Sequence, residues 1–90
     1  MVDLAASIIV HGKVHGVSFR ASTQAKALEL SLKGWVRNLP NGTVEVHVEG
    51  SRYSIDRLIK WCQKGPPLAK VSRYDIDWII PKGINEFRVL

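Results

Sequence analysis

The sequence KGWVRNLPNGTVEVHVE, residues 33–49, predicts two β-strands joined by a tight turn. The strands are residues 33–38 and 43–49, and the tetrapeptide LPNG between them supplies the proline and the Asn-Gly pair that are typical of turns. The second strand carries a valine at every other position, namely Val44, Val46 and Val48. Such alternation indicates that one face of the strand is buried.

Two helices are predicted, one on each side of this hairpin. Residues 21–32 repeat small or apolar side chains at the spacing of one helical face, at Ala21, Ala25, Leu28 and Leu32. Residues 52–64 carry a second stripe, formed by Ile55, Leu58, Ile59 and Cys62. Ser51 is the expected N-cap of this second helix, and Gly65 and Pro66 are expected to end it.

Further strands complete the pattern at both ends of the chain. Residues 5–11 predict a buried strand, and residues 69–80 predict a strand in which Tyr74, Ile76, Trp78 and Ile80 alternate with polar residues. Val71 is out of phase with this alternation, which predicts a β-bulge. The final residues, EFRVL, predict a short strand. The order βαββαβ with a small extra strand is typical of the ferredoxin-like α+β fold, in which two helices cover one face of a mixed, mostly antiparallel sheet.

This topology predicts which loops lie together. The helix of residues 21–32 forms a right-handed crossover, so the first two strands are parallel and the third lies between them. The loop from Lys13 to Arg20, the end of the second strand at Asn38 and the start of the third at Thr43 then share one edge of the sheet. We therefore expect a single domain over residues 1–90, with three distant segments meeting at one pocket.

Composition narrows the classes of partner. The chain has 90 residues and a formal net charge of +5, which favours anionic partners. No apolar run approaches the roughly 20 residues that a membrane span needs, so no membrane association is expected. The single cysteine, Cys62, excludes an intrachain disulfide and fits a cytoplasmic location. We expect a monomer.

The loop KVHGVSFR, residues 13–20, has the features of an anion site. It lies where a strand leads into a helix, whose first backbone N–H groups have no partner within the helix and carry a partial positive charge. Gly16 permits a close backbone approach, and Arg20 can make a bidentate contact to a phosphate or carboxylate. The start of the helix contains no acidic residue, which leaves its field available to an anion.

The motifs together resemble the acylphosphatase family. GKVHGVSFR followed by TQ, then GWVRNLPNGTVEV, EG, W and GPP, occur in order over nearly the whole chain. The resemblance implies a ferredoxin-like enzyme that hydrolyses acyl phosphates to a carboxylate and inorganic phosphate, with no metal and no cofactor. Positioning and electrostatic stabilisation suffice for such a reaction, because the carboxylate is already a good leaving group.

The resemblance also implies roles for individual residues. The phosphoryl group is expected on the loop formed by His15, Gly16, Val17, Ser18, Phe19 and Arg20, with Arg20 as the charged ligand. Asn38 is expected to orient the attacking water, and Thr43 matches a residue whose hydroxyl holds that asparagine. The family usually has Gln where this chain has His15, and this difference is expected to alter the pH profile or the affinity for the substrate.

Other interpretations of the same residues have less support. A serine nucleophile at Ser18 would need a glycine where Arg20 stands. The histidines His11, His15 and His47 lack the spacing of a metal site and are better explained as exposed or supporting residues. Cys62 is expected in the core, and the lysines Lys60, Lys64 and Lys70 are expected to form a solvated face.

The alternative of another class is a non-catalytic module that binds RNA or another polyanion. RNA-recognition modules share the βαββαβ topology, and the positive charge suits nucleic acid. Such modules stack bases on aromatic side chains of the central strands, whereas TVEVHVE, residues 43–49, has no aromatic ring of that kind and has two glutamates. Nucleic acid is therefore not the expected partner.

Overall fold

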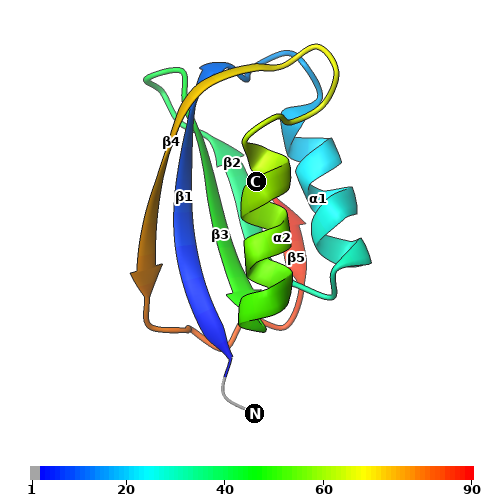
Figure 1. Ribbon diagram of the computed structural model, residues 1–90, viewed down its shortest axis with the longest axis vertical. Coiled ribbons are helices and arrows are strands. Elements are labelled where there is room, and N and C mark those ends of the chain that lie inside the picture. Colours follow the sequence, from blue (N-terminus) through cyan, green and yellow to red (C-terminus); the bar gives the residue numbers. More distant parts are fainter. Residues whose placement is uncertain (1–2) are drawn as a thin grey trace.

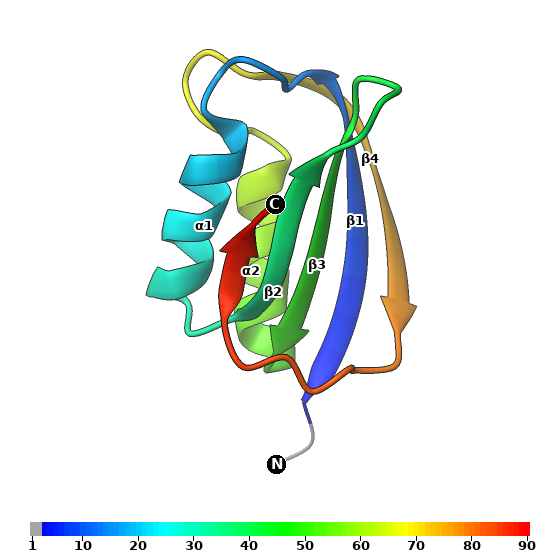
Figure 2. The ribbon, with the colours of Figure 1, turned by 180° about the vertical axis from the view of Figure 1, so that it is seen from behind.

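The structure is a computed structural model that describes residues 3–90. Its elements in chain order are β1 (Leu4–Lys13), α1 (Phe19–Glu29), β2 (Lys33–Asn38), β3 (Val44–Gly50), α2 (Arg52–Cys62), β4 (Lys70–Ile79) and β5 (Phe87–Val89). The five strands form one sheet in the order β4-β1-β3-β2-β5. Both helices lie on the same face of this sheet (Figure 1). Figure 2 shows the sheet from the other side, where no helix covers β1, β3 or β4.

The strand pairing confirms the predicted ferredoxin-like fold. β3 lies between β1 and β2 and is antiparallel to both, while β5 joins the outer edge of β2 in parallel. β4 pairs antiparallel with the other edge of β1. The loop after β1, the end of β2 and the start of β3 consequently meet at one end of the sheet, as expected.

The predicted β-bulge is present where β1 pairs with β4. His11 pairs with Arg73, but the next residue, Gly12, pairs with Val71, so Ser72 has no partner across the ladder. Gly12 has a φ of 120°, and a Cβ at this position would lie 2.1 Å from the carbonyl oxygen of Lys70. The bulge therefore needs glycine on the facing strand.

The hairpin valines and α2 form the core as predicted. Val44, Val46 and Val48 are each 0% exposed, and the α2 stripe of Ile55, Leu58, Ile59 and Cys62 packs over the same face of the sheet. Burial raises the pKa of the Cys62 thiol to about 12, which makes it an unreactive core residue. The Ser51 hydroxyl caps α2 by accepting a hydrogen bond from the Ser54 N–H at 3.1 Å.

The predicted register of the first helix is wrong. α1 begins two residues early, at Phe19, and ends at Glu29. Its buried residues are Phe19, Thr23 and Ala27, whereas Leu28 is 60% exposed and Leu32 is buried only after the helix has ended. Thr23 tolerates full burial because its hydroxyl donates to the Phe19 carbonyl oxygen at 2.7 Å. A count of apolar residues alone therefore selected the wrong face.

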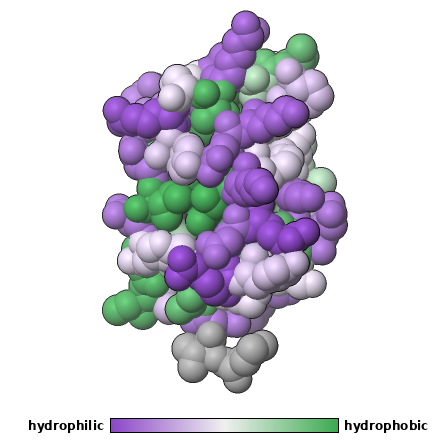
Figure 3. Space-filling model, in the orientation of Figure 1, coloured by the Kyte–Doolittle hydropathy of each residue, from purple (hydrophilic) through white to green (hydrophobic). Residues whose placement is uncertain are grey.

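The predicted burial of β4 is only partly right. Tyr74, Ile76 and Trp78 do share one face, since they pair with Val10, Ile8 and Ala6 of the core. However, β4 is an edge strand, and α2 packs over β1 and β3 rather than over β4 (Figure 1). Trp78 is consequently 45% exposed, and Ile80 lies beyond the strand and is 87% exposed. Figure 3 shows hydrophobic residues along this side of the molecule.

A buried carboxylate holds the connection between β4 and β5. Glu49, on β3, is 3% exposed although its position in the alternating pattern predicts the polar face. Three successive backbone N–H groups donate to it, those of Lys82, Gly83 and Ile84, at 2.8, 3.0 and 3.3 Å. This connection leads directly into β5.

A buried histidine supports the same carboxylate. His47 Nε2 lies 2.6 Å from Glu49 Oε2, and the imidazole stacks on Trp35 with 4.1 Å between the ring centroids. Burial by itself raises the pKa of Glu49, but the backbone donors and His47 outweigh it and hold the pKa below its usual value. Glu49 is therefore a stable anion inside the protein.

Candidate active site

A small pocket joins the predicted site residues. It has a volume of about 210 Å³ and lies where α1 begins, beside the end of β2. Its lining residues are Val14, Gly16, Ser18, Phe19, Arg20, Ala21, Asn38 and Val89. The structure thus brings together the loop and the asparagine that the sequence analysis selected, which are 18 or more residues apart in the chain.

The loop of residues 15–20 contributes Gly16, Ser18, Phe19 and Arg20 to this pocket, whereas His15 and Val17 do not line it. Val17 and Phe19 are buried, which anchors the loop on the core, while Gly16 and Ser18 have left-handed backbone conformations with φ of 69° and 62°. Within residues 3–90, no acceptor takes a hydrogen bond from the N–H groups of residues 15–20. A run of unpaired N–H groups that includes left-handed residues is a concave anion-binding arrangement.

The N-terminus of α1 adds to this positive potential. Ser18 is the N-cap residue but makes no capping hydrogen bond through its side chain, and the first turn contains no acidic residue. The free N–H groups of that first turn point out of the helix end, where the pocket lies. The pocket therefore favours a negatively charged ligand.

Arg20 is held at the mouth of the pocket by the end of β5. Its guanidinium Nη1 donates to the Leu90 carbonyl oxygen at 2.8 Å. The Leu90 N–H in turn donates to the Val36 carbonyl oxygen at 2.9 Å, which fixes the end of the chain against β2. Val89 and Leu90 were not among the site residues predicted from the sequence. The predicted terminal strand was the one available signal, and its parallel pairing with β2 is what brings it to the start of α1.

Asn38 is the last residue of β2 and pairs with Val44 across the hairpin. Its side chain is half-buried and lines the pocket opposite the loop. In the part of the chain that the structure describes, the Asn38 amide group makes no side-chain hydrogen bond to the protein. An amide of this kind can both donate and accept, so it is available to hold a water molecule.

The expected contact between Thr43 and Asn38 is not found. The Thr43 hydroxyl donates instead to Asn41 Oδ1 at 2.6 Å, and the Thr43 N–H donates to the same oxygen at 3.1 Å. The reason is the turn between β2 and β3, in which the Asn41 side chain folds back on the backbone two residues later. Thr43 therefore shapes the turn that follows Asn38 and makes no contact with the Asn38 amide.

His15 ties the loop to the same turn. Its Nε2 lies 2.8 Å from the Thr43 carbonyl oxygen, and since a carbonyl only accepts, the imidazole is the donor. His15 therefore does not line the pocket, and its imidazole braces the loop against the turn before β3.

The alternative chemistries find no support in the geometry. His11 bonds to Asp75 at 2.9 Å and His47 to Glu49, so these histidines have separate partners far apart in the sheet. Across residues 3–90 there is no group of three or more His, Cys, Asp or Glu side chains that could hold a metal ion. Ser18 Oγ has no hydrogen-bonded base in the same range, which a serine nucleophile would require.

No helix within residues 3–90 has the length and apolar character required to cross a bilayer.

Comparisons with known proteins give the family of this chain. The family model described as Acylphosphatase matches residues 6–89. The acylphosphatase of Acaryochloris marina is 51% identical over 89% of this chain and 83% of its own length, and that of Thermococcus kodakarensis is 43% identical over 100% and 99%. The structure of an acylphosphatase from Coxiella burnetii superposes with a TM-score of 0.95 at 43% identity, covering 98% of this chain and 93% of that one.

The chain therefore belongs to the acylphosphatase family. Its relatives are named as enzymes, and the family implies an acyl phosphate as the substrate.

Proposed function

We propose that the pocket between residues 15–20 and Asn38 is the site at which this acylphosphatase hydrolyses the carboxyl–phosphate bond of its substrate. The observation that carries the proposal is the run of unpaired backbone N–H groups beside Arg20, facing a neutral amide across a pocket of about 210 Å³. The products are a carboxylate and inorganic phosphate. The pocket is small, so it accepts the phosphoryl group while the acyl part extends toward solvent.

The loop and Arg20 bind the phosphoryl oxygens. The N–H groups of residues 15–20 and the α1 terminus donate to the equatorial oxygens, on which negative charge is spread in the transition state. The planar guanidinium of Arg20 gives two parallel donors, and its bond to the Leu90 carbonyl oxygen keeps it in place before the substrate arrives. These contacts are preorganised and cost no rearrangement during the reaction.

Asn38 orients the water that attacks phosphorus. Its amide oxygen accepts one water hydrogen, which directs the water lone pair toward the phosphorus atom from the side opposite the leaving group. As the new P–O bond forms, the bond between phosphorus and the carboxyl oxygen breaks, and its electron pair leaves with the carboxylate. The proton lost by the water goes to a phosphate oxygen, so no protein base is required.

His15 and Thr43 support these groups from behind. Their hydrogen bond of 2.8 Å joins the phosphate loop to the turn that follows Asn38. The distance between the bound phosphoryl group and the water therefore depends on this brace. This role for Thr43 replaces the direct contact that the sequence analysis expected.

The RNA-binding alternative is weakened by the uncovered face of the sheet. On the central strand β3, that face carries Glu45, His47 and Glu49, and Trp35 on the neighbouring strand is stacked on His47 and bonded to Glu45 at 3.0 Å. A base would meet two carboxylates there, and the one nearby indole is already engaged. Within this proposal the enzyme acts as a monomer in the cytoplasm on a small substrate, and both of these points stay predictions.

The test is release of inorganic phosphate from benzoyl phosphate in the presence of excess chelator. The proposal requires full activity with chelator, and competitive inhibition by inorganic phosphate. Loss of activity that one added divalent ion restores would contradict the metal-free mechanism. No hydrolysis of benzoyl phosphate or of a second simple acyl phosphate, acetyl phosphate, would contradict the proposed function.

A further inference from the structure

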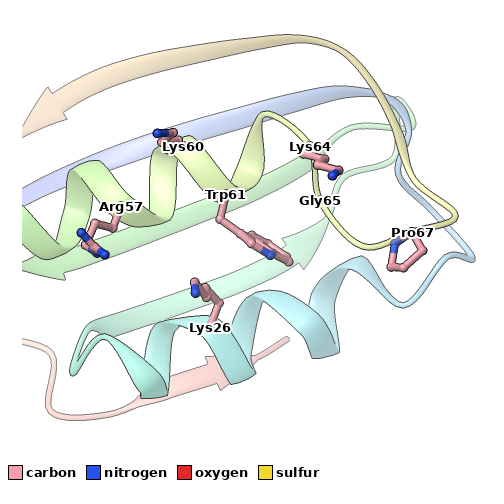
Figure 4. Close-up of a pocket in the computed structure, with 7 residues that line it drawn as sticks. All are labelled: Lys26, Arg57, Lys60, Trp61, Lys64, Gly65 and Pro67. Carbon is pink, nitrogen blue, oxygen red and sulfur yellow. The ribbon is translucent and has the colours of Figure 1, made fainter.

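A second and larger pocket lies on the outer surface of the helix layer. It has a volume of about 650 Å³ and shares no lining residue with the small pocket beside Arg20. Its lining residues are Lys26, Arg57, Lys60, Trp61, Lys64, Gly65 and Pro67. Figure 4 shows that Trp61 extends from α2 toward α1, and that Lys26 approaches it from the facing helix. Four of the seven lining residues are cations and none is acidic.

The arrangement of these cations follows from the helix geometry. Arg57, Lys60, Trp61 and Lys64 are spaced i, i+3, i+4 and i+7, which places them on one face of α2 and its final turn. Lys26 comes from the other helix, so the pocket is basic on both sides. Two lysines of the predicted solvated face, Lys60 and Lys64, thus line a concave surface together with Trp61.

Pairing within the protein does not neutralise this charge. No ion pair to Lys60, Lys64 or Arg57 is found among residues 3–90, while Lys26 has one exposed contact of 3.3 Å to Glu29. The acid on the α2 turn before the pocket, Asp56, pairs with Arg52 on another face. Lysines near a helix C-terminus do complement its dipole. That explanation covers Lys60 and Lys64, and also Lys26 in the last turn of α1, but it does not cover Arg57 near the middle of α2.

Trp61 offers a fixed planar surface beside the cations. It is half-buried, and its ring packs on Phe19 with 5.6 Å between the centroids. A tryptophan that is partly exposed and held from behind suits the stacking of a flat ring, such as a nucleobase. A volume of about 650 Å³ is in the range of small-molecule sites.

We propose that this pocket binds a nucleoside triphosphate, with the base stacked on Trp61 and the phosphate chain on the ammonium and guanidinium groups of Lys60, Lys64, Lys26 and Arg57. The combination selects against two simpler ligands. An inorganic polyphosphate satisfies the cations but leaves the indole exposed, and an uncharged nucleoside stacks but leaves the cations unpaired. The proposal is independent of the hydrolysis of acyl phosphates, because the two pockets have separate linings.

The experiment is an NMR titration of the ¹⁵N-labelled protein at low salt with ATP, tripolyphosphate and adenosine. ATP is expected to shift the Trp61 indole N–H and the amides of residues 57–65. Tripolyphosphate is expected to bind at least about fivefold more weakly than ATP, since stacking on an aromatic side chain contributes roughly 1–3 kcal/mol per base. Adenosine is also expected to bind at least about fivefold more weakly, because it has no phosphate groups to contact the cations. The Arg20→Lys variant should give the same shifts at the same ATP concentrations.

Variants separate the pocket from general positive charge. Lys60→Glu combined with Lys64→Glu should weaken ATP binding at least about tenfold, because reversing two charges changes the net charge of the site by about four units. The matched control, Lys33→Glu with Lys70→Glu, changes the net charge equally at exposed positions outside the pocket and should have an effect below about twofold. Trp61→Leu should abolish the preference for ATP over tripolyphosphate.

Four results would overturn the proposal. They are ATP shifts confined to residues 15–20, equal affinity for ATP and tripolyphosphate, equal weakening by both double variants, and no shifts at millimolar ATP. A single-stranded oligonucleotide that binds at least about tenfold more tightly than ATP, with shifts spread beyond the pocket, would assign the surface to nucleic acid instead.

Discussion

Two loops at opposite ends of the sheet, residues 82–84 and residues 15–20, both present successive backbone N–H groups. In the first, the occupied loop, these groups bind a carboxylate of the protein, whereas in the second, the open loop, they do not in the described part of the chain. Residues 82–84 direct three successive N–H groups at the Glu49 carboxylate, and Gly83 supplies the left-handed conformation with a φ of 78°. Residues 15–20 also contain left-handed residues, Gly16 and Ser18, but no acceptor within residues 3–90 takes their N–H groups. The connections lie at the two ends of the sheet in Figure 1.

The comparison shows that a run of backbone N–H groups stabilises the fold at residues 82–84 and is available to bind a ligand at residues 15–20. A buried carboxylate costs free energy when it is unpaired, so the connection before β5 supplies three N–H donors to Glu49. The other loop lines a pocket, where solvent or substrate can supply the oxygen atoms. These N–H groups and His47 hold the pKa of Glu49 below its usual value although burial raises it, because they favour the negative charge.

The largest expected effect comes from Arg20, the guanidinium group beside the open loop. Arg20→Lys keeps the charge but loses the planar pair of donors, and kcat/KM for benzoyl phosphate should fall about a thousandfold. Circular dichroism should show an unchanged fold, because Arg20 is only half-buried at the pocket mouth. Arg73→Lys, on the exposed edge strand β4, is the matched control with normal activity. An Arg20→Lys enzyme that retains most of its kcat/KM would remove Arg20 from the site.

The second prediction separates binding at the open loop from catalysis. Asn38→Ala should lower kcat about a hundredfold and leave the inhibition constant for phosphate nearly unchanged, because only the transition state loses an interaction. Steady-state kinetics with phosphate as inhibitor gives both quantities. Asn85→Ala, at an exposed position in the connection before β5, should change neither. Weakened phosphate binding with normal turnover would make Asn38 a ligand contact instead.

The third prediction removes the anion from the occupied loop. Glu49→Gln replaces charge-assisted hydrogen bonds by neutral ones and should lower the free energy of unfolding by about 2 kcal/mol. Urea unfolding at pH 7 measures this change, and Glu29→Gln on the exposed surface of α1 should have almost none. A loss below about 0.5 kcal/mol would show that the carboxylate does not anchor the loop.

The same carboxylate predicts a pH dependence with a definite sign. The pKa of Glu49 is lower in the folded protein than in the unfolded chain, so its stabilising effect is complete above the unfolded pKa. That effect is lost as the pH falls from the usual glutamate range through the folded pKa. The wild-type protein should therefore lose more stability than Glu49→Gln on acidification below pH 4.5, the reference value for glutamate.

The smallest expected effect concerns the turn that follows Asn38. Thr43→Ala removes the hydroxyl that bonds Asn41 and should lower kcat about fivefold, the equivalent of one neutral hydrogen bond of roughly 1 kcal/mol. Thr43→Ser keeps the hydroxyl and should restore turnover. If Thr43→Ala matches the loss seen with Asn38→Ala, Thr43 acts on the water-binding amide directly rather than through the turn.

Local sequence patterns sufficed to predict much of the fold and the composition of the small pocket. The alternating valines, the LPNG turn, the α2 stripe and the bulge next to Val71 all depend on the spacing of side chains over a few residues. The order of the elements then brought Asn38 to the loop of residues 15–20, because right-handed crossovers allow only one arrangement of the first three strands. The choice among chemistries came from the family resemblance of the motifs.

The partners of individual side chains were decided only by the tertiary structure. Sequence spacing determined that α1, β3 and β4 exist. Contacts distant in the chain determined that Phe19 begins α1 against Trp61, that Glu49 is buried under residues 82–84, and that Arg20 is held by Leu90. The physical reason is that a periodic pattern reports which face of an element prefers water. Whether a polar group on that face is buried depends on a donor or acceptor that another segment brings to it.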